Sequence, residues 1–164
     1  MEITVATKDQ LSIIRQLAQD IWYVAYKDII SVAQIDYMLN MMYSISSLEK
    51  QYHSNHVFLL IRQEDSFIGY ASYELDFEGT SKSKIHKLYV LPQFQGNGVG
   101  KLLVDKMTQI AKTANQKALV LNVNKYNKAV HFYQKLGFSI AFTTVLDIGN
   151  SYVMDDYVME IELY

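Results

Sequence analysis

The sequence predicts a mixed α/β domain with a mostly antiparallel sheet and helices on both faces. Segments that alternate like strands and segments whose apolar residues have helical spacing succeed one another along the whole chain. Two β-rich segments separated by a short polar stretch indicate an antiparallel hairpin. A later strand leads into a glycine-rich turn and a helix, and two strands end the chain. The predicted element order is β-α-α-β-β-β-α-β-α-β-β.

The first part of the chain predicts one strand followed by two helices. Residues 1–6 alternate as a strand, and Thr7 with Gln10 forms a capping-box pattern. Apolar residues then recur with helical spacing from Leu11 to Ile21. The same start signal predicts a second helix from Ser31 to Gln51.

The rest of the chain supplies the other strands and helices. The hairpin is predicted at His56–Arg62 and Phe67–Phe77, and the next strand at Ile85–Leu91. The strand after the glycine-rich helix is predicted at Ala118–Val123, and a short helix closed by Gly137 at Lys128–Leu136. No repeat, low-complexity tract or Gly/Pro/Ser linker interrupts them, so we expect one domain over residues 1–164.

Composition excludes several kinds of site. The chain has no cysteine, which rules out disulfides, thiolate metal sites and thiol nucleophiles, and no metal site is predicted. It shows no apolar run long enough to cross a bilayer and no leader pattern, so we expect a soluble, cytoplasmic protein without membrane contact. A net charge of −2 argues against nucleic-acid binding.

The charges are unevenly distributed. Between Thr80 and Lys135 there are ten lysines and a single acid, Asp105, whereas five acids and no base follow Lys135. The first of these regions therefore suits an anionic ligand and the second a cationic one. The alternative is that these side chains mostly form a solvated face.

The segment from Lys84 to Leu103 predicts a phosphate site. It reads as a strand, a turn and a glycine-rich helix start, which directs backbone N–H groups and the positive end of a helix dipole at one spot. It is not a P-loop, because Leu102 stands where Ser or Thr is required. A dinucleotide-binding fingerprint fails as well, because Lys101 replaces its third glycine.

Gln95, Gly98 and Gly100 instead match the Gln/Arg-x-x-Gly-x-Gly/Ala signature that follows a strand in the GNAT superfamily of acetyl-CoA-dependent N-acetyltransferases. A second segment, Leu121 to Phe138, resembles a strand and helix of the same superfamily. Its matching residues are Asn127, Ala129, Phe132, Tyr133, Gly137 and Phe138. The chain therefore resembles a GNAT acetyltransferase, which implies that the two strands around residues 84–91 and 118–123 splay apart to admit acetyl-CoA.

This resemblance also implies how the cosubstrate is held. The backbone of the strand would pair with the pantetheine arm through Leu88, Tyr89 and Val90. Amides of the turn and helix start would surround the pyrophosphate at Gln95, Gly96, Asn97, Gly98, Val99, Gly100 and Lys101. Asn127 would donate a hydrogen bond to the cosubstrate.

Two residues are candidates for proton transfer. By position, Tyr133 would act as general acid for the departing thiolate, although a tyrosine here could also simply anchor the core. His86 lies in an Ile-His-x-Leu-x-Val pattern that some small-amine acetyltransferases of the superfamily use for a catalytic histidine. We expect it to share a strand face with Leu88 and Val90 and to accept a proton from the amine. The alternative is a half-buried histidine that is bonded across the sheet.

The sequence is less specific about the residues that would bind the acceptor amine. Trp22 and Tyr26 lie in an aromatic, Met-rich pair of helices, and Glu74 and Asp156 are acids that could reach the substrate, so these four are predicted to bind a cationic amine. Residue for residue, the apolar side chains of these helices are better candidates for the core than for a pocket. Weak resemblance to PaiA-like polyamine acetyltransferases favours a polyamine or a similar small amine.

Without cysteine or a recognisable Ser-His-Asp pattern, we expect direct acetyl transfer. The alternatives are acetylation of a protein amino terminus or lysine, and a non-catalytic acyl-CoA sensor. The β-rich carboxyl terminus could also pair with a second copy to form a homodimer.

Overall fold

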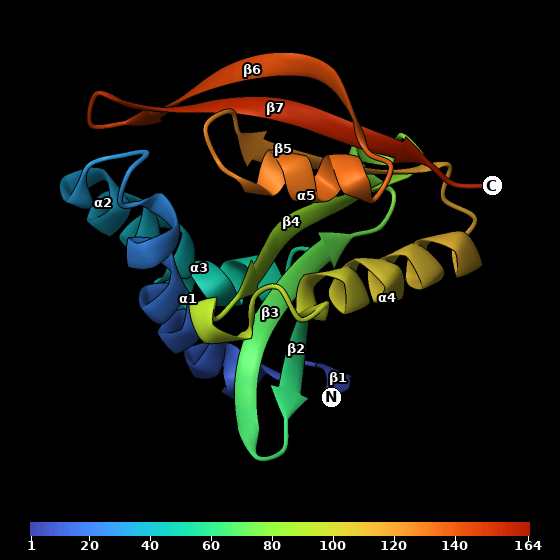
Figure 1. Cartoon of the computed structure of the whole chain (residues 1–164), viewed down its shortest axis with the longest axis horizontal. Helices are drawn as coiled ribbons and strands as arrows, with labels where there is room; N and C mark the ends of the chain where they lie inside the picture. The colour runs from blue at the N-terminus through green and yellow to red at the C-terminus, as the bar shows by residue number, and fades with distance from the viewer.

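The computed structural model describes all residues from 1 to 164 and confirms the predicted fold class. Seven strands form one sheet in the order β1-β2-β3-β4-β5-β7-β6, with helices on both faces (Figure 1). The elements are β1 Glu2–Val5, α1 Leu11–Tyr26, α2 Val32–Tyr43, α3 Ile45–Tyr52, β2 Val57–Gln63, β3 Ser66–Glu74, β4 Lys82–Val90, α4 Val99–Thr113, β5 Ala118–Asn124, α5 Ala129–Lys135, β6 Ser139–Gly149 and β7 Tyr152–Glu162. Short 3-10 turns occupy Lys8–Gln10, Phe77–Gly79 and Pro92–Phe94.

The predicted second helix is wrong in one respect, because it is broken into α2 and α3 at Ser44. The backbone of Ser44 is extended (ψ 148°), and its hydroxyl accepts a hydrogen bond from the N–H of Ser47 at 3.2 Å. A serine hydroxyl that caps a new helix competes with continuation of the old one. Apolar spacing alone did not reveal this break. The start signal at Ser31 is confirmed, since its hydroxyl accepts from the N–H of Gln34.

Each face of the sheet has its own hydrophobic core. On one face, α4 and α5 pack through Leu103, Met107 and Val130 against strand residues such as Leu121 and Met159. On the other face, α1, α2 and α3 pack against β2 and β3, with the cluster Leu11, Ile14, Ile21, Ile35, Tyr43, Leu48, Phe58, Leu60 and Tyr70 at its centre. The sheet therefore separates two sides, α4–α5 and α1–α3. None of the helices is both long and apolar enough to span a membrane.

The pairing of β4 with β5 is short. These two strands are the sheet's parallel pair, and they pair only from Lys82 with Ala118 to Ile85 with Leu121. All other neighbours are antiparallel. Beyond Ile85 the two strands diverge, which leaves the β5 side of β4 unpaired from residue 86 to residue 90. The predicted opening between these strands is confirmed.

The C-terminal hairpin of β6 and β7 reaches across to α2 (Figure 1). The Tyr37 hydroxyl of α2 donates to the backbone oxygen of Ile148 at 2.6 Å, and the Gln34 amide donates to the backbone oxygen of Val153 at 3.0 Å. The tip of the hairpin is thereby fastened to the second helix. This contact closes the α1–α3 side of the opening.

Candidate active site

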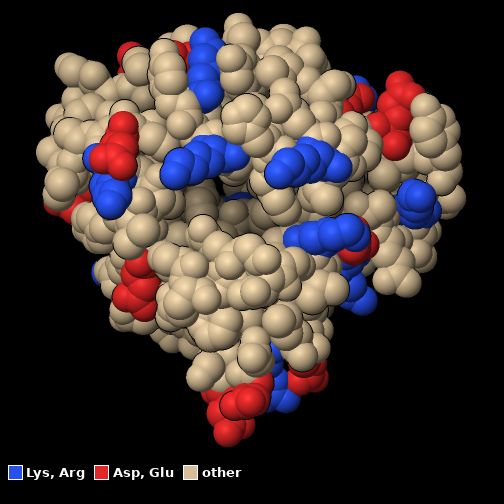
Figure 2. Space-filling model, viewed as in Figure 1, with Lys and Arg blue, Asp and Glu red and all other residues tan.

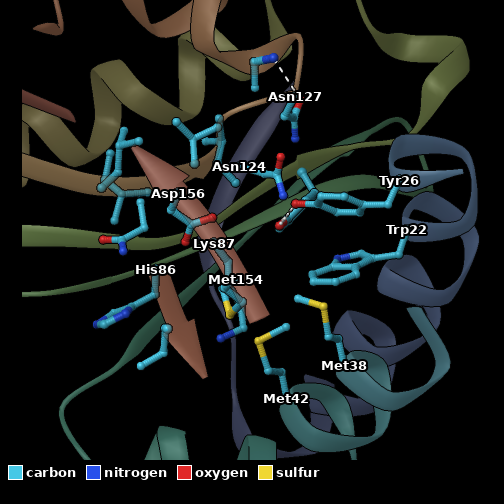
Figure 3. Close-up of a pocket in the computed structure, with 18 of the residues that line it drawn as sticks. Trp22, Tyr26, Met38, Met42, His86, Lys87, Asn124, Asn127, Met154 and Asp156 are labelled. Carbon is cyan, nitrogen blue, oxygen red and sulfur yellow. Dashed lines mark hydrogen bonds between the residues drawn. The ribbon is translucent and has the colours of Figure 1, made fainter. Parts of the chain in front are cut away.

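A cavity of about 270 Å³ opens where β4 and β5 diverge. Its walls come from α1, α2, β4, β5, α5 and the β6–β7 hairpin (Figure 3). The polar and aromatic lining comprises Trp22, Tyr26, Gln34, Tyr43, Lys84, His86, Lys87, Tyr89, Asn122, Asn124, Asn127, Tyr133 and Asp156. The cavity therefore joins the two sides of the sheet through the opening between the strands.

A β-bulge places His86 in this cavity. Ser72 pairs with Lys87 and Tyr73 pairs with Ile85, so His86 has no partner across β3. The extra residue interrupts the alternation of side chains along β4. Leu88 and Val90 consequently pack on the α4–α5 side, whereas His86 points to the α1–α3 side. The expectation that His86 shares a face with Leu88 and Val90 is wrong, and the bulge is the reason.

His86 belongs to a compact polar group with Glu74 and His56. The Nε2 atom of His86 lies 2.8 Å from Oε2 of Glu74, and Nε2 of His56 lies 3.6 Å from the same oxygen. The two imidazole rings stack with their centroids 4.0 Å apart and their planes at 11°. Glu74 itself does not line the cavity, so the structure places it behind His86 rather than beside a substrate.

Burial and nearby cations keep both imidazoles neutral. Burial lowers the pKa of His56 to about 4, with smaller effects from Lys87 and Lys84. Burial also lowers the pKa of His86 far below its usual value, and His56 and the two lysines add to this. The three donor atoms lie within 4.8 Å of one another, a spacing that a metal ion could bridge. Nearly parallel ring planes, however, keep the two in-plane lone pairs from meeting at one ion in this arrangement.

Tyr133 lies in the wall formed by α5. It is almost fully buried and packs edge-on against Phe132 and Phe138. Burial raises the pKa of Tyr133 above its usual range, so that the hydroxyl stays protonated at neutral pH. It lines the cavity, as does Asn127. The Asn127 side-chain oxygen accepts from the N–H of Ala129 at 2.9 Å (Figure 3), and its side chain also interacts with the Tyr26 hydroxyl, whose pKa is raised by burial and, to a smaller extent, lowered by this contact.

The α1–α3 side of the cavity is strongly aromatic. Trp22 contacts the rings of Tyr26, Tyr43 and Tyr89 at centroid distances of 4.6, 5.6 and 5.6 Å. The hydroxyls of Tyr26 and Tyr89 are 2.9 Å apart. Trp22 and Tyr26 thus line the cavity as predicted substrate residues, and they also belong to the core. Their role in the core is observed, whereas their role in substrate binding stays a prediction.

Asp156 and Lys84 line the cavity where the strands diverge. Asp156 lies on β7 opposite Asn124 and is only 4% exposed. Burial raises the pKa of Asp156, while a hydrogen bond from Asn122 opposes this shift. Burial lowers the pKa of Lys84, and the charges of Glu78, Glu74 and Asp156 oppose that. The charge of Lys84 is therefore balanced by acids around it.

The glycine-rich turn has the shape that an anion requires. Gly96 (φ +80°) and Gly98 (φ +78°) are left-handed, and a Cβ added to either would meet nothing within 4 Å. Gly98 caps α4 without a side-chain hydrogen bond, so the first N–H groups of this 15-residue helix are available. Gly100 differs, because its Cβ would lie 3.1 Å from the ring of Phe132. The Gln95 amide fastens the turn by donating to the Val90 backbone oxygen at 3.0 Å.

Basic side chains surround the entrance on the α4–α5 side. Figure 2 shows lysine or arginine side chains bordering a hollow in this face. The predicted lysine-rich region includes Lys101 on α4, Lys128 before α5 and Lys135 at its end. Lys101 is exposed and paired with Asp105. This distribution suits an anionic molecule on the α4–α5 side of the sheet.

Sequence reasoning missed Lys87, the asparagines Asn122 and Asn124, and Met154, all of which line the cavity. Simple alternation places Lys87 opposite His86, and only the bulge brings both to one side. Met154 reaches the cavity because its hairpin folds back over α2. No local pattern in the sequence signals either event.

Known proteins resemble this chain in sequence and in fold. A model of the Acetyltransferase (GNAT) family matches residues 12–138. The chain belongs to the GNAT family. MnaT of Escherichia coli, an L-amino acid N-acyltransferase, is 30% identical over 86 residues, which cover 50% of each protein. An uncharacterized N-acetyltransferase of Methanocaldococcus jannaschii is 31% identical over 94 residues, covering 49% of this chain and 42% of that protein. The matched part is thus about half the length of these relatives.

Solved structures share the whole fold of this GNAT chain. The PaiA N-acetyltransferase of Thermoplasma acidophilum, in complex with coenzyme A, gives a TM-score of 0.80 at 22% identity and covers 99% of both chains. The yncA protein of Salmonella typhimurium, with acetyl-CoA, gives 0.69 at 20% identity and covers 100% of this chain and 94% of that one. At these identities the likeness establishes the fold.

A Gly98→Ala substitution tests the anion site at the start of α4. We expect it to raise the dissociation constant of CoA at least about tenfold, because the new methyl group occupies the space that a phosphate needs. Gly79→Ala is the matched control, since Gly79 also has positive φ (+68°) and open space around it but lies away from α4. Both changes should lower the free energy of unfolding by about 1 kcal/mol. Equal CoA affinity in both variants, measured by calorimetry, would refute the assignment.

Proposed function

We propose that the chain transfers an acetyl group from acetyl-CoA directly to the primary amine of a small molecule. The observation that carries this proposal is the cavity at the divergence of β4 and β5. It is lined by a proton donor, Tyr133, and by an aromatic and acidic wall. The glycine-rich turn that follows β4 leads into the free N–H groups at the start of α4. Membership of the GNAT family and the predicted cosubstrate agree with this arrangement.

The residues present fit acetyl-CoA. The backbone of β4 at Leu88, Tyr89 and Val90 would pair with the pantetheine arm on the side that β5 leaves free, next to the Val90 oxygen that already accepts from Gln95. The N–H groups from Gln95 to Lys101 would bind the pyrophosphate, and the NH₂ group of Asn127 would donate to the pantetheine. Bound there, acetyl-CoA supplies the activated acetyl group.

Tyr133 is the proposed general acid. Its raised pKa keeps the proton on the hydroxyl until a stronger base forms, and the departing thiolate is such a base. Its aromatic neighbours Phe132 and Phe138 hold the ring in place. Anchoring the core and donating a proton are therefore compatible roles for this side chain.

His86 is the proposed proton acceptor. If Glu74 accepts the hydrogen on Nε2, the lone pair of the neutral ring lies on Nδ1. Burial and the lysines weaken the ring as a base, but Glu74 opposes this because its carboxylate stabilises the imidazolium once it forms. In this scheme Glu74 positions His86 instead of binding the substrate.

The proposed acceptor is a small cationic amine such as a polyamine. Asp156 offers a buried carboxylate to an ammonium group, and Trp22 and Tyr26 offer aromatic faces. The structural likeness to PaiA is consistent with a polyamine. A cavity of about 270 Å³ accommodates a small molecule better than a folded protein segment.

A homodimer is also proposed. The β6 strand forms one edge of the sheet and exposes Ile140, Phe142, Val145 and Leu146. An exposed apolar edge strand of 11 residues is a site at which a second copy can pair.

An amine screen tests the function as a whole. We expect thiol release from acetyl-CoA with at least one acceptor among spermidine, spermine, diamines, aminoglycosides, amino acids and peptides with free amino termini. Mass spectrometry identifies the acetylated product. Peptide products alone would support a protein acetyltransferase, and tight CoA binding without any turnover would support a sensor.

A Tyr133→Phe substitution tests the general acid. Turnover should fall by about 10² to 10⁴-fold while the dissociation constant of CoA stays unchanged, because only one hydroxyl is lost. Tyr52→Phe on α3 is the control, since Tyr52 does not line the cavity. Full turnover of the Tyr133 variant, with chemistry rate-limiting, would remove the proposed role.

A Glu74→Gln substitution tests whether Glu74 supports His86 as the proton acceptor. In the unsubstituted protein the acid limb of kcat should lie below the ordinary histidine pKa of about 6.5, because neutral His86 is required and its pKa is lowered. The amide cannot stabilise the imidazolium, so kcat should fall about 10- to 10²-fold. Glu78→Gln, at an exposed acid near Lys84, should change little. An unaltered pH profile and kcat in Glu74→Gln would contradict this scheme.

A further inference from the structure

Lys87 is a buried cation without an acidic partner. The residue is 8% exposed, and its ammonium donates one hydrogen bond, to the side-chain oxygen of Gln51 on α3. The rings of Tyr43 and Phe58 lie 5.5 and 5.7 Å from its Nζ. Burial lowers its pKa to about 8, and no acidic group is among the causes of the shift. Lys84, which lies on the same strand, differs because acids surround it.

A structural role does not account for this charge. Gln51 is already held by its own bonds to the Met42 backbone oxygen at 2.8 Å and to the Ser47 hydroxyl at 3.1 Å. An apolar side chain of equal length would fill the same space between α3 and β4 without desolvating a charge. An ammonium has three donor hydrogens, and Gln51 accepts only one of them. Because Lys87 also lines the cavity, the remaining donors are available to a ligand.

The anion that would pair with Lys87 is not a phosphate of CoA. The anion site at the start of α4 lies on the α4–α5 side of the sheet, where Val99 and Leu103 pack. Lys87 points to the other side, against Tyr43 and Phe58 of the α1–α3 core. An anion that meets Lys87 must therefore belong to the molecule on the acceptor side.

We infer that the acceptor is an amino carboxylate, whose carboxylate pairs with Lys87 while its amine lies towards Asp156. Figure 3 shows Lys87 and Asp156 directed into one cavity, with Met38, Met42 and Met154 among its walls. These methionines suit an apolar body between the two charged ends. The inference rests on the proposed transfer to a small primary amine, and it specifies an amino acid as that amine in place of a polyamine.

Matched acceptor pairs test this inference. Leucine is compared with 3-methylbutylamine, and ornithine with putrescine, because the members of each pair differ only by the carboxylate. We expect the carboxylate-bearing member to have a kcat/KM at least about 30-fold higher, the effect of a desolvated ion pair. Lys87→Met should bring this ratio close to one. Lys112→Met, at an exposed lysine near the end of α4, should leave the ratio unchanged.

Other outcomes overturn the inference. A preference for putrescine over ornithine in the unsubstituted protein would favour a polyamine, and an unchanged ratio in Lys87→Met would show that Lys87 does not recognise the carboxylate. An equal loss for both members of a pair would indicate a structural role, which thermal unfolding of Lys87→Met and Lys87→Gln would reveal. Leucine binding in the presence of CoA is measured by calorimetry. Binding that depends on Lys87 without turnover would refute the proposed function and leave the inference intact.

Discussion

The bulge at His86 is the constraint on which the site depends. It inserts one residue into β4 opposite the Ser72–Tyr73 step of β3, and β4 loses its pairing with β5 directly afterwards. A bulge bends its strand and increases the local twist. The same irregularity thus coincides with the opening between β4 and β5 and brings His86 and Lys87 to one side of the sheet. Regular pairing here would restore the alternation of side chains, so that His86 and Lys87 could not both lie on one side of the sheet.

The two sides of the sheet differ in their charged and polar groups. On the α4–α5 side, free N–H groups and lysines suit an anion that is partly exposed to water. On the α1–α3 side, few charged groups line the cavity, and desolvation dominates the pKa shifts of His86, Lys87 and Asp156. A buried charge interacts more strongly with a ligand than an exposed one, because less water screens it. We therefore propose that selection of the acceptor rests on a few side chains, chiefly Lys87 and Asp156.

The acceptor side is enclosed by elements from both ends of the chain. The helices α1 and α2 supply the aromatic and methionine wall. The β6–β7 hairpin completes it and is held in place by hydrogen bonds from Tyr37 and Gln34 of α2. Gly149 at the hairpin tip is suited to this contact, since a Cβ there would lie 2.7 Å from the Tyr37 hydroxyl. This close approach couples the position of the hairpin to that of α2. The shape of the acceptor cavity thus depends on contacts more than one hundred residues apart in the sequence.

The sequence by itself determined the fold class, the element order apart from one helix break, and the glycine-rich turn before α4. These features follow from local periodicity, capping residues and left-handed glycines such as Gly98, which act over a few positions. The structure also confirmed the opening between β4 and β5 that the family resemblance implied. Only the tertiary structure decided that Glu74 supports His86, that Lys87 enters the cavity, and that Met154 completes its wall. A bulge and long-range packing set these positions, because they depend on which strand or helix lies opposite, and no local pattern specifies that neighbour.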